Sequence, residues 1–147
     1  MKLEIIKGDL FDVKLPENSF YAHCISADFA LGAGIAKIFD KKFGTRYKLC
    51  RKYSCCKGTP DLVGTSCIVD NIFNLVTKWH YYDKPTLDSL ELAINQMRKQ
   101  CYMFNIKNIY MPKIGCGLDK LKWDDVSKIL EKEFKNTDIN IFVYYLK

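Results

Sequence analysis

Several features that would assign this sequence to a specialised class of protein are missing from it. Its 147 residues contain two histidines and no Cys-x-x-Cys pair, so its seven cysteines do not indicate a metal site. No apolar run reaches the roughly 18 residues that a membrane span requires. The first residues also lack the apolar stretch of a signal peptide. We therefore expect no metal, no cofactor and no membrane contact, and free thiols in a cytoplasmic protein (or a nuclear one, in a eukaryote).

Linkers are missing as well. No Pro-, Ser- or Gly-rich stretch, low-complexity segment or internal repeat divides the chain, and 147 residues is an ordinary length for one domain. A chain of this size buries roughly 70% of its unfolded surface, which is enough for a core without disulfides. We therefore interpret residues 1–147 as a single domain and expect it to act as a monomer.

What the sequence does contain is an alternation of apolar strands and amphipathic helices. Asp70-Asn71 separates two short apolar runs, which predicts a hairpin. The alternation as a whole predicts a layered α/β domain with helices on both faces of a largely buried sheet. In such sheets ligands bind at the carboxyl ends of the strands. The predicted strands are 3–7, 19–25, 67–69, 72–76, 108–111 and 139–146, and the predicted helices are 35–43, 46–52, 87–104 and 123–134.

Two glycine loops follow predicted strands. Gly32 and Gly34 come just before a helix, where free backbone N–H groups can point at an anion. Gly115-Cys116-Gly117 follows the strand 108–111 and can form a nest around a diphosphate. This loop lacks the Lys-Ser/Thr of a Walker loop and the spacing of a Rossmann fingerprint. Each loop on its own is also compatible with a simple turn.

A lysine marks the end of a third strand. Lys78 follows the run Ile72–Val76 directly, so its roles include a phosphate contact, a nucleophile or an ordinary surface residue. Since the carboxyl ends of neighbouring parallel strands share one edge, Lys78 and the two glycine loops would gather there. One diphosphate ligand would then contact both loops.

The positive charge is concentrated in one region. The formal charge is +6, and many of the basic residues lie between Lys41 and Lys57. This pattern suits a polyanionic ligand such as a nucleotide, DNA or RNA. It equally suits a solvated helix face, and direct binding of DNA or RNA through residues 46–57 remains an alternative function.

Five blocks of the sequence stand at the ends of predicted strands, in a fixed order. The blocks are Gly8-Asp9-Leu10-Phe11, His23-Cys24-Ile25-Ser26, Gly32-Ala33-Gly34-Ile35-Ala36, Thr77-Lys78 and Pro112–Asp119. Together they resemble the macrodomain family, and the resemblance extends over nearly the whole chain. Within that family they are most similar to the branch with the terminal ADP-ribose protein glycohydrolase and the macrodomains of DNA ADP-ribosylation antitoxins.

The resemblance implies a fold and a ligand. The fold would be a three-layer α/β/α macrodomain around a mixed, mostly parallel sheet of six strands, and the ligand would be ADP-ribose. Asp9, with the backbone of Leu10, would recognise the adenine, because a carboxylate accepts a hydrogen bond from its exocyclic amine. The remaining ligand-binding residues carried over from the family are Ser26, Gly32, Gly34, Ile35, Thr77, Gly115, Cys116, Gly117 and Leu118.

The resemblance also implies a reaction carried by Lys78 and Asp119. The neutral amine of Lys78 would attack the anomeric carbon of the distal ribose and form a covalent intermediate. Asp119 would act as acid and base or stabilise positive charge on the sugar. Lys84 is a competing lysine, but it does not stand directly after the strand. The asparagine of other macrodomains is replaced here by Ser26-Ala27-Asp28, which favours the lysine route.

The expected activity is removal of ADP-ribosyl groups from a carboxylate side chain or a nucleobase. Trp79 and Tyr81-Tyr82 are bulky beside the site, so we expect the preferred leaving group to differ from that of relatives. A shared pocket leaves two enzymatic alternatives open, dephosphorylation of ADP-ribose 1″-phosphate and deacetylation of O-acetyl-ADP-ribose. A non-catalytic reader of ADP-ribose is a further alternative. The expected partner is ADP-ribose itself, or an ADP-ribosylated protein or nucleic acid.

Overall fold

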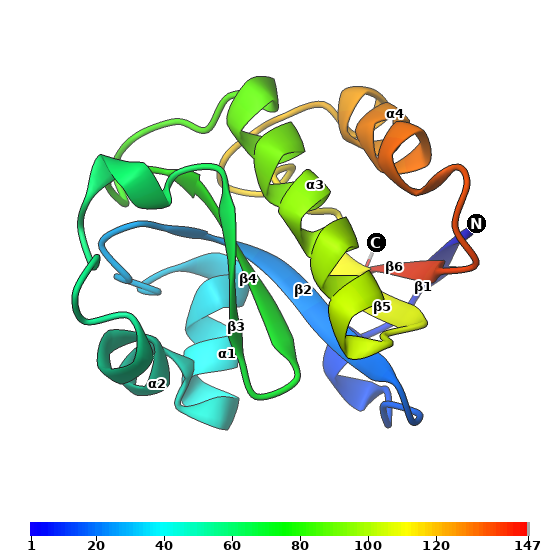
Figure 1. Cartoon of the computed structure of the whole chain (residues 1–147), viewed down its shortest axis with the longest axis horizontal. Helices are drawn as coiled ribbons and strands as arrows, with labels where there is room; N and C mark the ends of the chain where they lie inside the picture. The colour runs from blue at the N-terminus through cyan, green and yellow to red at the C-terminus, as the bar shows by residue number, and fades with distance from the viewer. Residues whose placement is uncertain (147) are drawn as a thin grey trace.

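The computed structural model of the protein describes residues 1–146 and contains strands and helices in alternation (Figure 1). The ten strands and helices expected from the sequence are all present, with ends within a few residues of those expected. Two short 3-10 helices, η1 and η2, were not expected. The elements are β1 (Lys2–Lys7), η1 (Leu10–Asp12), β2 (Ser19–Ser26), α1 (Gly34–Phe43), α2 (Thr45–Lys52), η2 (Pro60–Leu62), β3 (Thr65–Val69), β4 (Ile72–Lys78), α3 (Leu87–Phe104), β5 (Asn108–Pro112), α4 (Trp123–Phe134) and β6 (Asn140–Tyr145).

The six strands form one sheet in the order β1-β6-β5-β2-β4-β3. Every neighbouring pair is parallel except β3 and β4, which form the predicted hairpin. Asp70 takes a left-handed conformation (φ 53°) at the tip, as a two-residue hairpin turn requires. The mixed, mostly parallel six-stranded sheet expected from the resemblance is therefore confirmed.

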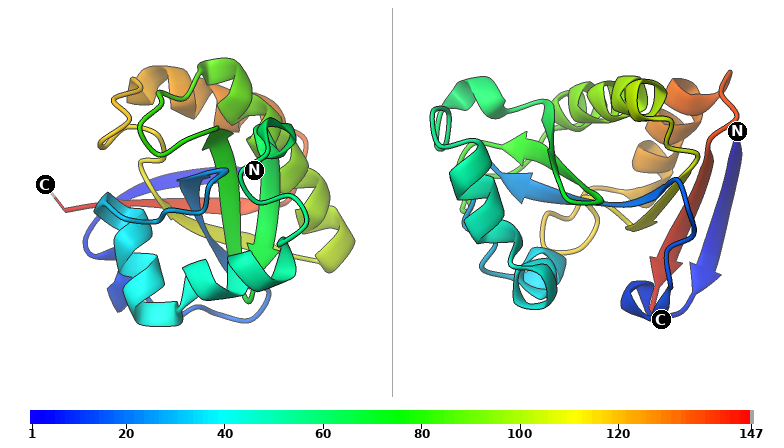
Figure 2. Two further views of the ribbon diagram at one scale, coloured as in Figure 1. Left: turned by 90° about the vertical axis from the view of Figure 1, so that its left-hand side faces the viewer. Right: turned by 60° about the horizontal axis from the view of Figure 1, so that its bottom comes forward.

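Helices cover both faces of the sheet. Figure 2 shows α3 and α4 on one face and α1 and α2 on the other. Leu90, Ile94 and Met97 of α3 are fully buried against the sheet on the first face. On the second face, Phe39 of α1 and Leu49 of α2 are also fully buried. The three-layer α/β/α architecture follows from this division of apolar side chains.

The helix boundaries have local causes. Thr86 and Ser89 form a reciprocal capping box at the start of α3. Gly44 ends α1 in a left-handed conformation (φ 64°), a geometry that glycine adopts without strain. By its spacing Leu87 falls on the same face of α3 as Leu90 and Ile94, but it is 37% exposed, because it lies in the first turn of the helix.

The topology brings five loops together. Strands β1, β6, β5, β2 and β4 run in the same direction, so the segments after their carboxyl ends share one edge of the sheet. These segments include Asp9, both glycine loops and Lys78. No helix within residues 1–146 has the length and apolar character of a membrane span.

Candidate active site

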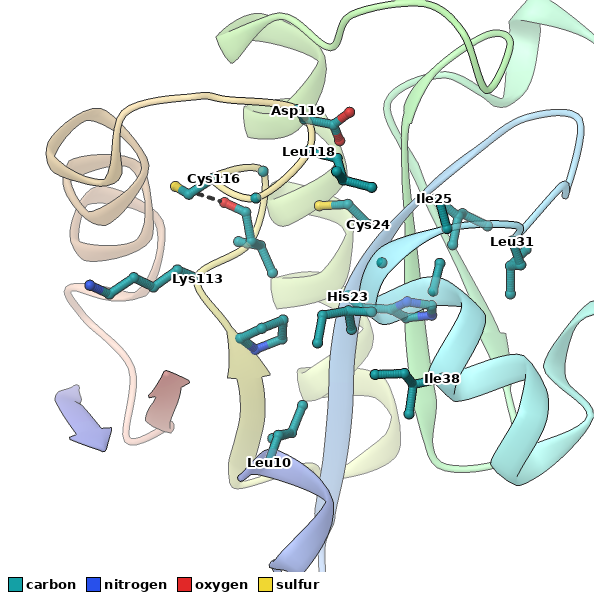
Figure 3. A pocket seen from close by; sticks show the side chains of 18 of the residues that line it. Leu10, His23, Cys24, Ile25, Leu31, Ile38, Lys113, Cys116, Leu118 and Asp119 are labelled. Carbon is teal, nitrogen blue, oxygen red and sulfur yellow. Dashed lines mark hydrogen bonds between the residues drawn. The ribbon is translucent and has the colours of Figure 1, made fainter. Parts of the chain in front are cut away.

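A cavity of about 1190 Å³ opens at the carboxyl edge of the sheet. Segments after all five parallel strands line it, together with the start of α1, and Figure 3 shows its side chains arranged around the ends of β2 and β5. A volume of this size is somewhat larger than the usual range of ligand sites, about 300–1,000 Å³. The predicted site residues that line it are Asp9, Leu10, Ser26, Gly32, Gly34, Ile35, Lys78, Gly115, Cys116, Gly117, Leu118 and Asp119.

Thr77 is the predicted ligand-binding residue that the structure does not place in this lining. Successive side chains of a strand point to opposite faces of the sheet. With Lys78 at the cavity, Thr77 points to the face that α3 covers, and its side chain is buried, with 2% of the residue exposed. Ser89 of α3 donates a hydrogen bond to the Thr77 carbonyl oxygen (2.6 Å). Thr77 therefore contributes to packing under the site.

Lys78 and Asp119 form an ion pair inside the cavity. The distance from Lys78 Nζ to Asp119 Oδ1 is 2.7 Å, and the two side chains are only 15% and 18% exposed. Lys78 ends β4, while Asp119 lies in the loop after β5, 41 residues further along the chain. Figure 3 shows Asp119 at the tip of its loop, next to Leu118 and above Cys24. The cavity therefore contains one amine and one carboxylate that can exchange a proton directly.

The two glycine loops touch each other across the cavity. A Cβ atom built on Gly34 would lie 3.2 Å from Leu118 Cδ1, and Gly34 has a φ of 58°. At Gly115 (φ 73°) a Cβ would lie 2.9 Å from Leu121 Cδ1, closer than real Cβ contacts come. Both positions therefore require glycine. A Cβ on Gly117 would meet nothing within 4 Å, so that glycine leaves the backbone open to a ligand.

Asp28 connects the first glycine loop to the segment after Lys78. Its Oδ1 accepts hydrogen bonds from Ser26 Oγ (2.6 Å) and Ala30 N (3.1 Å), and its Oδ2 accepts one from Tyr81 N (2.9 Å). Burial raises the pKa of Asp28, but these hydrogen bonds outweigh it and hold the pKa below its ordinary value. In the sequence, Asp28 is notable only as part of the segment that lacks the asparagine of other macrodomains. A short acidic side chain in a loop gave no signal for this role.

Asp9 has one oxygen engaged at the other end of the cavity. Its side chain caps η1 by accepting a hydrogen bond from Phe11 N (2.9 Å at Oδ1). A carboxylate has two oxygens with about four acceptor positions, so Oδ2 remains available to an amine donor in the cavity.

The floor of the cavity is apolar enough to suppress ionisation. Burial raises the pKa of the Cys24 thiol to about 12, with a smaller contribution from the charge of Asp119. Burial also lowers the pKa of His23 to about 4, although a hydrogen bond to Asn74 opposes the shift. Both groups are therefore neutral near pH 7.

Lys113 is a second side chain whose position the sequence did not indicate. Its Nζ lies 4.7 Å from the ring centre of Tyr145 and 5.9 Å from that of Trp123. Lys113 and Tyr145 both line the cavity. Cation–π contacts of this kind hold an amine in place without neutralising it. Within residues 1–146 no cluster of three or more histidine, cysteine or acidic side chains is suited to a metal ion.

Comparison with known proteins relates this cavity to a family. The family model described as "Macro domain" matches residues 22–130. Human "ADP-ribose glycohydrolase OARD1" is 38% identical over 145 residues, covering 99% of this chain and 92% of the human protein. "ADP-ribose 1''-phosphate phosphatase" of Meyerozyma guilliermondii is 29% identical, covering 97% of this chain and 98% of that protein. Among solved structures, the macrodomain of Thermus aquaticus DarG superposes with a TM-score of 0.82 at 19% identity, and each chain covers 97% of the other.

Proposed function

We propose that this chain, which belongs to the macrodomain family, is an ADP-ribose-binding hydrolase that removes ADP-ribosyl groups through Lys78 and Asp119. The observation that carries the proposal is the 2.7 Å contact between Lys78 Nζ and Asp119 Oδ1 inside the cavity. Binding of ADP-ribose alone would not require an amine and a carboxylate that are paired and largely buried in the pocket. The glycohydrolase and phosphatase names of its relatives agree with a hydrolytic role.

The pair suits a two-step displacement. Asp119 accepts the ammonium proton, and the freed amine of Lys78 attacks the anomeric carbon of the distal ribose. The bond from that carbon to the acceptor breaks, and the acceptor leaves with the bonding electrons. Water then adds to the same carbon, the carbon–nitrogen bond breaks, and ADP-ribose is released. The lysine is restored in the second step, so the reaction is catalytic in enzyme.

The loops supply the binding energy in this proposal. In this proposal the diphosphate is bound by backbone N–H groups at the start of α1, near Gly34, and in the loop around Gly117. Asp9 Oδ2 meets the adenine amine at the far end of the cavity. The ligand then lies with its adenine near Asp9 and its distal ribose near Lys78.

Substitution of Lys78 tests the proposal. We expect Lys78→Ala and Lys78→Arg to retain ADP-ribose binding in calorimetry and to lose turnover by at least about 1000-fold, since each lacks the attacking amine. The ribose ring of the lysyl intermediate can open to an imine, which borohydride should reduce and so trap in the unaltered protein. Peptide mass spectrometry should then place the adduct at residue 78. Lys84→Ala is the matched comparison, because Lys84 also lines the cavity.

The outcomes separate the alternatives. If Lys78→Ala stays active while Lys84→Ala fails, the nucleophile has been assigned to the wrong lysine. Binding of ADP-ribose without release from any conjugate indicates a reader. The turnover assay also includes ADP-ribose 1″-phosphate and O-acetyl-ADP-ribose as substrates. Faster turnover of either than of the ADP-ribosyl conjugates would replace the glycohydrolase assignment with a phosphatase or a deacetylase.

A further inference from the structure

Two adjacent cysteines stand in the turn that follows α2. Cys55 is exposed, Cys56 is partly buried, and both are free thiols. Their sulfur atoms lie 3.7 Å apart, in hydrogen-bond contact. The turn that contains them, residues 53–58, is called the cysteine turn below. It therefore holds two thiols side by side at a place that solvent reaches.

The cysteine turn is hydrogen-bonded to the backbone on both sides of Lys78. Gly58 N donates to Ala27 O (2.7 Å), and Gly58 O accepts from Trp79 Nε1 (2.9 Å). Trp79 follows Lys78 directly, while Ala27 N donates to Lys78 O (2.9 Å). A displacement of Gly58 would therefore act on the backbone of Lys78 through two separate contacts.

Hydrogen bonds within the cysteine turn make Gly58 follow the cysteines. Tyr53 O accepts a hydrogen bond from Cys56 N (3.1 Å). Cys56 O accepts two from Thr59, one from its backbone N (3.1 Å) and one from Oγ1 (2.8 Å). The Cys56 side chain also packs against the buried cluster that contains Ala27. Since Gly58 lies between these contacts, a rearrangement at Cys56 would move it.

Burial makes several other thiols of the chain unreactive. It raises the pKa of Cys67 to about 11 and that of Cys24 and Cys101 to about 12. The thiolate is the form that reacts with oxidants, so these three side chains stay protonated and inert near pH 7. Cys55 is the only one of the seven cysteines that is exposed. Contact with the Cys55 sulfur raises the pKa of Cys56, so Cys56 keeps its proton while Cys55 reacts.

Adjacent cysteines cannot form a relaxed disulfide. Consecutive Cα atoms are about 3.8 Å apart across a trans peptide bond, whereas a disulfide usually joins Cα atoms about 4.4–6.8 Å apart. The two sulfur atoms must also approach from 3.7 Å to about 2.05 Å. Closure therefore distorts the backbone of the cysteine turn. Strained, exposed disulfides are readily reduced, and this property is typical of regulatory sites.

We propose that Cys55 and Cys56 form a reversible oxidation site, whose disulfide slows the reaction at Lys78. The oxidant is a peroxide. The Cys55 sulfur bonds to one oxygen of hydrogen peroxide, the oxygen–oxygen bond breaks, and a sulfenic acid and one water form. The Cys56 sulfur then displaces that oxygen, which leaves with the Cys56 proton as a second water. Both sulfurs are oxidised, the peroxide is reduced, and a dithiol reverses the step by exchange.

Peptide mapping tests the oxidation site without any assay of activity. Trypsin cuts after lysine and arginine, so residues 53–57 form one peptide that contains both cysteines and no other. After treatment with hydrogen peroxide, this peptide should lose the mass of two hydrogen atoms and resist alkylation by iodoacetamide. Dithiothreitol should restore its mass and its alkylation. A disulfide that instead links Cys56 to Cys67, or joins two molecules, would overturn the proposal.

The fluorescence of Trp79 reports whether the turn moves. Trp123→Phe leaves Trp79 as the single tryptophan. In this background, peroxide should shift the Trp79 emission, because its hydrogen bond to Gly58 O is disturbed, and dithiothreitol should reverse the shift. Cys55→Ser cannot form the disulfide and should show no shift. Cys50→Ser is the matched control on α2 and should respond as the unaltered protein does.

An emission shift that persists in the Cys55→Ser protein would contradict the assignment of the oxidation site. A disulfide that forms between Cys55 and Cys56 without any change in Trp79 emission would contradict its connection to the segment after Lys78.

The effect on turnover rests on the proposed function. The oxidised protein should have a kcat about tenfold or more below that of the reduced protein, because Lys78 is displaced from its alignment, and dithiothreitol should restore it. Cys55→Ser should match the unaltered protein in reducing buffer and keep its activity in peroxide. Equal inactivation of the Cys55→Ser protein would locate the damage at another thiol, such as Cys116 in the cavity, and overturn the proposal.

The two proposals can fail separately. If turnover depends on Lys78 and the Cys55–Cys56 disulfide leaves kcat unchanged, the regulatory effect is wrong and the hydrolase stands. If the reduced protein turns over no conjugate, while the disulfide forms and shifts the Trp79 emission, the hydrolase fails and the oxidation site stands.

Discussion

The backbone N–H of Tyr81 donates a hydrogen bond to Oδ2 of Asp28, 53 residues earlier in the chain. Asp28 thereby connects the loop that enters α1 with the segment that follows Lys78. The adjacent backbone pair Ala27 N to Lys78 O (2.9 Å) joins the same two segments. Asp28 therefore acts as a positioning residue for Lys78. The two residues are too far apart in the sequence for a local motif to indicate this role.

We expect Asp28→Ala to lower kcat about tenfold or more, because the loop after Lys78 loses its anchor. We also expect it to reduce the free energy of unfolding by about 1–2 kcal/mol, because two part-buried donors, Ser26 Oγ and Ala30 N, lose their acceptor. Urea unfolding and steady-state kinetics measure the two effects. Ser26→Ala is the comparison, since it removes only one of the three hydrogen bonds. An Asp28→Ala protein with unaltered kcat would show that the anchor does not position Lys78.

The two glycines of the loop after β5 should respond differently to the same substitution. Gly115→Ala places a Cβ at positive φ and 2.9 Å from Leu121 Cδ1, so it should lower the free energy of unfolding by about 1–3 kcal/mol. Gly117→Ala meets open space and should change stability by less than about 0.5 kcal/mol while weakening ADP-ribose binding. Thermal unfolding and calorimetry separate the two losses. The reverse pattern would mean that Gly115, not Gly117, faces the ligand.

Much of this architecture was predictable from the sequence because local patterns and burial agree. The period of Leu90, Ile94 and Met97 predicts the extent of α3, and the two-residue turn at Asp70 predicts the β3–β4 hairpin. Positions that depend on where a strand side chain points were harder to predict from the sequence. Thr77 and Lys78 are neighbours in one motif, but only Lys78, the last residue of β4, lines the cavity, whereas Thr77 is buried beneath it.

The contacts that the sequence could not reveal join distant segments through single side chains. Asp28 with Tyr81, and Lys113 with Tyr145, involve ordinary loop residues whose partners lie more than 30 residues away. The stacking of Trp79, His80 and Tyr82 is local, but it depends on side-chain rotamers and on the hydrogen bonds of Asp83. The position of these residues directly after Lys78 indicated bulky side chains beside the site and left their ordered arrangement open.

Asp9 should determine the preference for adenine over hypoxanthine. Its free oxygen accepts from the exocyclic amine of adenine, while hypoxanthine presents a carbonyl oxygen that a carboxylate repels. The unaltered protein should therefore bind ADP-ribose at least about tenfold more tightly than inosine diphosphate ribose. Asp9→Asn keeps an oxygen to cap η1 and supplies an amide donor, so it should reduce this discrimination in calorimetry. Unchanged discrimination in the Asp9→Asn protein would place the adenine elsewhere in the cavity.

His23 should make the stability of the protein fall in mild acid. It is 1% exposed, stacks on Phe39, and donates from Nε2 to Asn74 Oδ1, because the Asn74 amide group is occupied by Cys67 O. Burial lowers its pKa to about 4, whereas an unfolded chain protonates histidine near pH 6.5. Between those values the unfolded state binds one more proton, so the stability that His23 contributes is complete above pH 6.5 and decreases as the pH falls towards 4, by roughly 3 kcal/mol in all. Urea unfolding across this range measures the loss.

His23→Gln is the matched control. It loses the ring that stacks on Phe39, so it should be less stable at pH 7. It can still donate to Asn74 but does not titrate, so it should lose less stability between pH 6.5 and 4.5. Equal losses in the two proteins would show that His23 is not the group that titrates.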